Sequence, residues 1–162
     1  MKPNRRGADP AARLCGHLLV LAGGHDRAAL ADAVASSVHG NSLTERHHYG
    51  AVLEWTVTAI ADVIVDKLGP IDSGAETDKV LTLRTPEGEN LTIEQLPPPE
   101  RHVWRAIADN LAGDALRGHR RLRPVVHVSD AEKRTHALIE AVDWLDHLLD
   151  MPVRDEPDTL TE

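Results

Sequence analysis

Apolar residues recur every three or four positions along most of the chain, which is typical of amphipathic helices. Five helices are expected: from Pro10 to about Ala22, between Asp26 and Gly40, from the cap at Ser42 to Leu68, from about Pro99 to Arg120, and from the cap at Ser129 to Met151. A proline at a first helical position, glycines after last positions, and two capping boxes, SLTE and SDAE, mark the boundaries. The chain is therefore predicted to be mainly α.

The longest predicted helix, which ends at Leu68, is apolar around most of its circumference. Its segment LEWTVTAIADVIV also alternates like a strand, but that strand would far exceed the usual length of about five or six residues. A surface helix needs an apolar arc of only about 100°. Either this helix is the centre of the bundle or one side packs against a second chain. We expect a two-fold homodimer with Val57, Ala61 and Val65 at the interface, since they share one side of the helix at spacing four.

Polar and apolar residues alternate in KVLTLR and NLTIEQL, which flank the turn sequence PEGE and end before three prolines. This pattern predicts a β-hairpin over about residues 79–96. Residues 70–79 are expected to form an exposed loop. The expected architecture is a five-helix bundle with one inserted β-hairpin, in a single domain over 10–151. A disordered leader, 1–9, precedes it, and a solvated acidic tail, 152–162, follows it.

The stretch LAGGHDRAAL at 21–30 nearly recurs as LAGDALRGHR at 111–120. Apolar positions of the two halves match at offsets of 90, Val38-His39 and Val126-His127 match at 88, and Trp55 and Trp144 match at 89. This pattern suggests a helix, a glycine break, a second helix and a capped long helix, used twice as two pseudo-repeated units. Shared helical periodicity would also align many apolar positions, so duplication and chance both stay open. A phosphate-binding loop is disfavoured because the GK[ST] ending is missing.

Composition narrows the class of protein. A chain of 162 residues with 41% hydrophobic content is long enough for one ordinary core, which must be aliphatic because there is no Phe and only one Tyr. The net charge of -8 argues against broad binding to nucleic acid or membrane surfaces. A single cysteine, Cys15, suggests a reducing compartment, so we expect a cytoplasmic protein. Basic residues before the first apolar run also outline a secretory signal, but His17 and helical spacing favour a helix there.

One dense basic cluster stands out, and we assign it as a site for a partner protein or an anion: Arg117, Arg120, Arg121 and Arg123. Guanidinium groups bind phosphate and carboxylate groups well. The alternative is that these cations complement the dipole at a helix C-terminus and are screened by Asp155, Glu156 and Asp158 of the tail. No aromatic residue lies near the cluster to stack on bases, so we expect no duplex binding at physiological salt.

Two resemblances bear on enzymatic or nucleic-acid function. Arg121 and His127 stand at the spacing R-x5-H, which resembles the motif of the all-helical HEPN ribonucleases and would imply an RNA-cleaving site shared by a dimer. The segment ALADAVAS, followed by a capped long helix, resembles the N-terminal helix pair of histone-like HU proteins.

Histidine and carboxylate patterns supply weaker candidates. Glu45 and His48 form an isolated E-x-x-H, whereas a di-iron bundle requires two such motifs. Glu45 is instead expected to complete a helix cap. The face formed by Glu140, Asp143, His147 and Asp150 is expected to be solvated surface. We assign no catalytic residue, metal site or cofactor.

The leading expectation is therefore a non-enzymatic interaction or regulatory protein that acts on an unknown protein partner. The alternatives are a helical hydrolase or nuclease that uses His and Arg residues, either HEPN-like or metal-dependent, and a nucleic-acid-binding module built on Arg117–Arg123.

Overall fold

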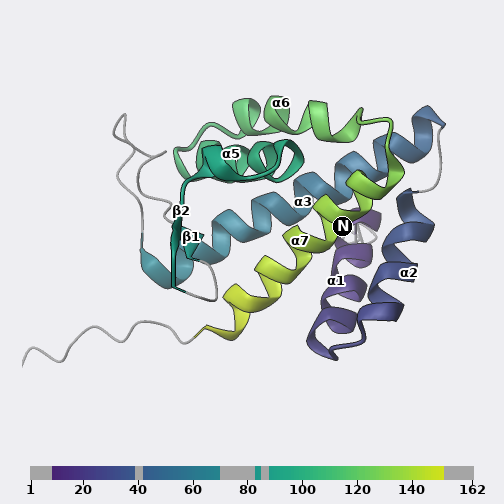
Figure 1. The fold of residues 1–162 in the computed structure, drawn as a ribbon, viewed down its shortest axis with the longest axis horizontal. Helices are drawn as coiled ribbons and strands as arrows, with labels where there is room; N and C mark the ends of the chain where they lie inside the picture. Colours follow the sequence, from purple (N-terminus) through teal and green to yellow (C-terminus); the bar gives the residue numbers. More distant parts are fainter. Residues whose placement is uncertain (1–8, 39–41, 70–82, 85–87, 152–162) are drawn as a thin grey trace, which may run out of the picture.

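The computed structural model describes residues 9–38, 42–69, 83–84 and 88–151 (Figure 1). The chain is mainly helical, as predicted. The first half consists of α1 Pro10–Gly23, α2 Arg27–Val38 and α3 Leu43–Leu68, and the second half of α5 Pro98–Leu111, α6 Ala115–Val126 and α7 Ala131–Asp150. Between them lie β1 Leu83–Arg84, β2 Asn90–Leu91 and the short 3-10 helix η1 Ile93–Gln95. The expectations for the loop 70–79 and the acidic tail, and most of the leader, fall outside the described residues.

Side-chain caps begin the helices largely where the sequence indicated. Asp9 accepts a hydrogen bond from the Ala11 N–H at 3.0 Å and starts α1. The capping box of α3 is complete, since Ser42 Oγ accepts from Glu45 N and the Glu45 carboxylate accepts from Ser42 N. The second predicted box is wrong in detail. Asp130 caps α7 by accepting from the Glu132 N–H, one residue later than expected.

The predicted count of five helices is wrong, because the described ranges contain six α-helices. The single helix expected from Pro99 to Arg120 is divided between α5 and α6. Gly113 adopts a φ of 82°, and Asp114 caps α6 by accepting from the Arg117 N–H at 2.9 Å. The second helix then continues through Pro124, which is exposed.

The structure shows part of the expected hairpin. Leu83 lies opposite Leu91 in an antiparallel pair of two-residue strands. Most of the first predicted strand and half of the turn sequence PEGE lie outside the described residues, so the longer hairpin stays a prediction. The second strand of the hairpin is shorter than predicted, because residues Ile93–Gln95 form the 3-10 helix η1 and not a strand.

The helices α3 and α7 cross at the centre of the molecule, with α1 and α2 on one side and α5 and α6 on the other (Figure 1). This arrangement buries the broad apolar surface of α3 inside one chain. Val57 is 0% exposed and Ala61 5%, whereas Val65 is 38% exposed. Val57 and Ala61 therefore belong to the core of the single chain, and of the three residues predicted at a dimer interface only Val65 is exposed; the dimer itself stays a prediction.

The first residues of the helices in the two halves recur at one constant spacing. Pro10 and Pro98, which begin α1 and α5, are 88 residues apart, and so are the first residues of α2 and α6 and those of α3 and α7. The breaks also correspond, because His25 and Gly113 both adopt positive φ, at 56° and 82°. The capping residues Asp26 and Asp114 follow at the same spacing.

This common spacing corrects the offsets of 89 and 90 expected from apolar matches. At 88 residues, Trp144 corresponds to Thr56, so Trp55 and Trp144 are not at equivalent positions. Apolar positions recur every three or four residues in any amphipathic helix and tolerate such shifts, whereas caps and breaks do not. The superposition of the two halves stays a prediction.

Candidate anion-binding groove

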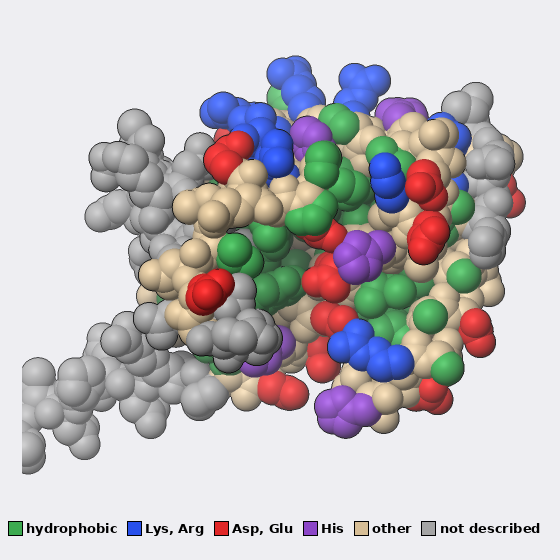
Figure 2. Space-filling view, viewed as in Figure 1, with side chains coloured by type: hydrophobic (Ala, Val, Ile, Leu, Met, Phe, Trp, Pro, Cys, Tyr) green, Lys and Arg blue, Asp and Glu red, His purple; other side chains and the backbone are tan. Residues whose placement is uncertain are grey.

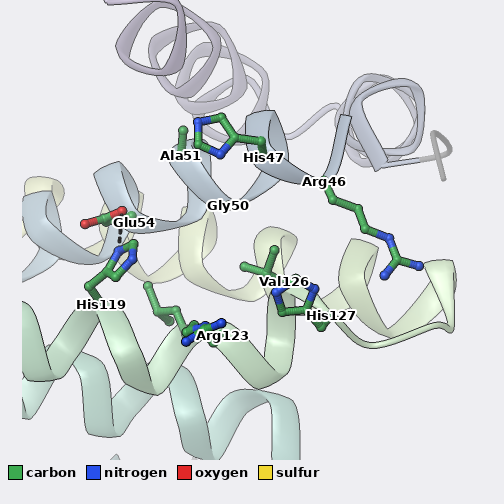
Figure 3. A pocket seen from close by; sticks show the side chains of 10 residues that line it. Arg46, His47, Gly50, Ala51, Glu54, His119, Arg123, Val126 and His127 are labelled. Carbon is green, nitrogen blue, oxygen red and sulfur yellow. Dashed lines mark hydrogen bonds and ion pairs between the residues drawn. The ribbon is translucent and has the colours of Figure 1, made fainter. Parts of the chain in front are cut away.

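A groove with a cavity volume of about 350 Å³ separates the N-terminal half of α3 from α6 (Figure 3). We call it the α3–α6 groove. Its lining residues are Arg46, His47, Gly50, Ala51 and Glu54 from α3, His119, Leu122, Arg123 and Val126 from α6, and the α6 C-cap residue His127. Two guanidinium groups and three imidazoles thus line a groove that contains one carboxylate.

Helical periodicity brings these residues together, since the lining positions on each helix are three, four or seven residues apart and share one face. The helices approach closely at Gly50, where an added Cβ would lie 3.3 Å from Val126 Cγ2. His119 and Arg123 extend from α6 on the side that faces α3 (Figure 3). The small residue at position 50 therefore lets the helices touch while the longer polar side chains line the space beside that contact.

The polar groups of the groove are largely available to a ligand. His119 Nδ1 lies 2.9 Å from Glu54 Oε2, and both side chains are about half exposed. Arg123 and His127 are exposed. The Nε atom of Arg46 is buried and has no hydrogen-bond partner among the described residues. A buried donor without a partner is costly, so an acceptor supplied by a ligand would stabilise this side chain.

The arginine cluster predicted from the sequence is divided among different faces of α6. Arg117 Nε and Arg121 Nε lie 3.6 Å and 3.2 Å from the carboxylate of Asp109 on α5. Arg120 is exposed, and of the four arginines only Arg123 lines the groove. Lys and Arg side chains project along α6 at the top of Figure 2. Two of the predicted anion-binding residues are thus already paired with a carboxylate of the chain.

Sequence reasoning missed the groove residues on α3 and also His119. Arg46 and Glu54 share a helical face, but no local signal pairs that face with α6. The Glu54–His119 contact joins residues that are 65 positions apart in the chain.

The residues proposed for an enzyme do not converge. His127 lines the groove, whereas Arg121 contacts Asp109 and does not line it. Glu45 is part of the helix cap with Ser42. Within the described ranges, no group of three or more His, Cys, Asp or Glu side chains is placed to hold a metal ion.

The equivalent contact on the other side of the bundle, between α2 and α7, is filled. The positions 88 residues after Gly50 and Glu54 are Leu138 and Val142, both 0% exposed. On the facing helix, α2 has alanines at the positions that correspond to His119 and Arg123 of α6. Side-chain size and polarity therefore distinguish the open groove from its closed equivalent.

Arginine occupies the same position in both contacts, as Arg46 and Arg134. Arg134 is 1% exposed and donates hydrogen bonds to the carbonyl oxygens of Val38, at 3.2 Å, and Val128. Arg46 is only partly buried, and its Nε is unpaired within the described part of the chain. Arg134 therefore closes a helix end, whereas Arg46 lines the groove with an unpaired donor.

No family model, curated protein or solved structure matches this chain. None of the described helices has both the length and the apolar character needed to cross a membrane.

Proposed function

We propose that this protein is a non-enzymatic binding protein that holds acidic side chains of a partner protein in the α3–α6 groove. The observation that carries the proposal is the convergence of Arg46 and Arg123 with three imidazoles in one groove of a chain whose net charge is -8. Guanidinium groups bind carboxylates through paired, charge-assisted hydrogen bonds. A local basic groove on an acidic protein also selects its partner, because the rest of the surface repels acidic segments.

The lining of the groove supports binding over catalysis. It contains no Ser, Thr or Cys that an adjacent base would activate as a nucleophile. Its one His–carboxylate pair, His119 with Glu54, is about half exposed, whereas catalytic pairs are usually held in water-excluded sites.

Two features of the organisation belong to the same proposal. The constant spacing of 88 residues between helix starts supports a duplicated three-helix unit, one copy of which has acquired the groove. The cysteine is buried, with its sulfur 3.4 Å from Thr56 Oγ1, which fits a reduced thiol in the cytoplasm. We also keep the homodimer as a proposal. Of the three residues predicted at its interface, Val65 is the one exposed on the surface.

A fluorescence polarisation titration with labelled hexaglutamate tests the groove. We expect binding that weakens as salt is raised and that falls at least about tenfold in the double variant Arg46→Gln, Arg123→Gln, because each charge-assisted bond contributes roughly 1.5–3 kcal/mol. The matched control, Arg13→Gln with Arg120→Gln, removes the same charge from two exposed positions outside the groove. Circular dichroism checks that both variants are folded.

Three outcomes contradict the proposal: no binding by the wild type, an equal loss in both double variants, or stronger binding of hexaglutamine than of hexaglutamate. Duplex DNA and single-stranded RNA of matched charge serve as further ligands. Tighter binding of either nucleic acid than of the peptide, at about 150 mM salt, would favour the nucleic-acid module instead.

A further inference from the structure

A second cavity of about 350 Å³ lies between α5 and α7. We call it the α5–α7 cavity. Figure 2 shows a hollow between these helices, with hydrophobic side chains inside it and acidic and histidine side chains along its edge. This cavity shares no lining residue with the α3–α6 groove.

The walls of the cavity are apolar and aromatic. Trp104 and Trp144 meet edge to face, with ring centroids 5.1 Å apart and an interplanar angle of 88°. Ile60, Leu91 and Ile107 contribute aliphatic surface. Such walls favour an apolar group, and the electron-rich faces of indole rings also attract cations.

Two carboxylates provide the polar part of the lining. Glu100 Oε1 lies 2.8 Å from His136 Nε2, and the Glu100 side chain is 14% exposed. Burial raises the pKa of Glu100, the charge on His136 lowers it, and Glu140 raises it again. Glu100, Glu140 and His136 line the same cavity, so the two carboxylates share one site. A cationic group would relieve their mutual repulsion.

The equivalent region of the first half is filled. At the 88-residue spacing, Ala137, Glu140 and Ala141 of α7 correspond to Tyr49, Val52 and Leu53 of α3, which are 2%, 0% and 0% exposed. The Tyr49 hydroxyl also donates to the Arg134 carbonyl at 2.8 Å. Two alanines replace large side chains in the second half, and a glutamate replaces a valine. The cavity thus arises where large apolar residues are absent and an acid is added.

We propose that the α5–α7 cavity binds a small organic cation, an ammonium group that carries an apolar chain. The ammonium group lies beside Glu100 and Glu140, and the apolar chain packs against Trp104 and Trp144. Pockets with mostly apolar walls and a few convergent polar groups are typical of small-molecule sites. An anionic ligand is disfavoured by the two carboxylates.

Tryptophan fluorescence measures binding directly. In a Trp55→Phe background the signal comes only from Trp104 and Trp144. Three probes share one alkyl chain: hexyltrimethylammonium, 1-hexanol and hexyl sulfate. We expect the cation to bind at least about threefold more tightly than the alcohol, because it gains a cation–π contact and the attraction of partly exposed carboxylates. The sulfate should bind most weakly.

Two variants separate charge from shape. Glu140→Gln should weaken binding of the cation about threefold and leave that of hexanol unchanged. Glu132→Gln, the same change at an exposed position of α7, should alter neither. Ala141→Leu, which restores the size of Leu53, should abolish binding of both probes while circular dichroism shows an unchanged helix content.

Several results would overturn the proposal: equal affinity for the three probes, preference for the sulfate, an unchanged affinity of Glu140→Gln for the cation, or no fluorescence change with any probe. Failure here leaves the groove proposal intact, because hexaglutamate binding is measured at different residues.

Discussion

The contact between α2 and α7 and the contact between α3 and α6 join helices whose first residues correspond at the 88-residue spacing, yet one contact is filled and the other is open. Leu138 and Val142 fill the first, and Gly50 and Glu54 stand at the same positions of the second. The backbone arrangement therefore does not require a groove. Leu138 and Val142 bury apolar side chains in the filled contact, whereas Gly50 has no side chain and the Glu54 side chain is about half exposed.

A second difference explains how α6 is positioned. A Cβ added to Gly118 would lie 2.6 Å from Asn110 Nδ2 and 3.0 Å from the Ala106 carbonyl oxygen, so α6 packs very closely on α5. The equivalent residue of α2 is Leu30, which is buried, and α1 and α2 pack less closely than α5 and α6. Gly118 therefore lets α6 lie directly against α5.

The largest expected effect comes from exchanging one pair of equivalent residues. Val142→Glu places a carboxylate in the filled contact, and we expect it to cost at least about 4 kcal/mol or to prevent folding. Glu54→Val, in the groove, should change the free energy of unfolding by less than about 1 kcal/mol, because it removes only a half-exposed pair. Urea denaturation measures both. Similar losses in the two variants would contradict the distinction between the contacts.

The two equivalent arginines should differ by a smaller amount. Arg134→Gln removes donors from two carbonyl groups and should lower the free energy of unfolding by about 2–3 kcal/mol. Arg46→Gln should change it by less than about 0.5 kcal/mol, because Arg46 Nε has no hydrogen bond to lose among the described residues. Chemical denaturation followed by circular dichroism gives both values. A cost for Arg46→Gln equal to that for Arg134→Gln would mean that Arg46 is structural.

The free energy of unfolding should depend on pH through Tyr49, a buried residue of α3. Burial raises the pKa of Tyr49, so the folded chain favours the neutral phenol. Its stabilising contribution is complete below the unfolded pKa of about 10, and above it should fall by roughly 1 kcal/mol per pH unit. Urea denaturation at pH 8 and pH 11 measures the loss, and Tyr49→Phe should reduce it. Burial also raises the pKa of Cys15, so ionisation of this thiol at high pH lowers the free energy of unfolding too. That part of the loss should persist in Tyr49→Phe. An equal pH dependence in both proteins would argue against this assignment.

Local signals predicted most of the fold. The Ser42–Glu45 box and the Asp9–Pro10 start depend on neighbouring residues, and the structure confirms both. The five-helix count lacked the break at Gly113-Asp114 because the apolar period continues across it, although the pattern of two repeated units, each with a glycine break, contained it.

The site depends on packing between distant segments, which no local signal carries. The arginines of α6 are close in sequence, but the rotation of the helix sends Arg117 and Arg121 to Asp109 and only Arg123 to the groove. Likewise, α3 has an apolar surface that fits either a central helix or a dimer. Only the arrangement of the other helices shows that Val57 is buried within the chain.

The central claim is that the α3–α6 groove, and not its filled equivalent, binds acidic groups. The most direct measurement is a titration of isotopically labelled protein with hexaglutamate, followed through backbone amide chemical shifts. We predict saturable shifts at 46–54 and 119–127, with the positions 88 residues away on α2 and α7 unchanged. Shifts confined to the outer face of α6 around Arg117 and Arg120, equal shifts in both contacts, or no saturation would contradict the account.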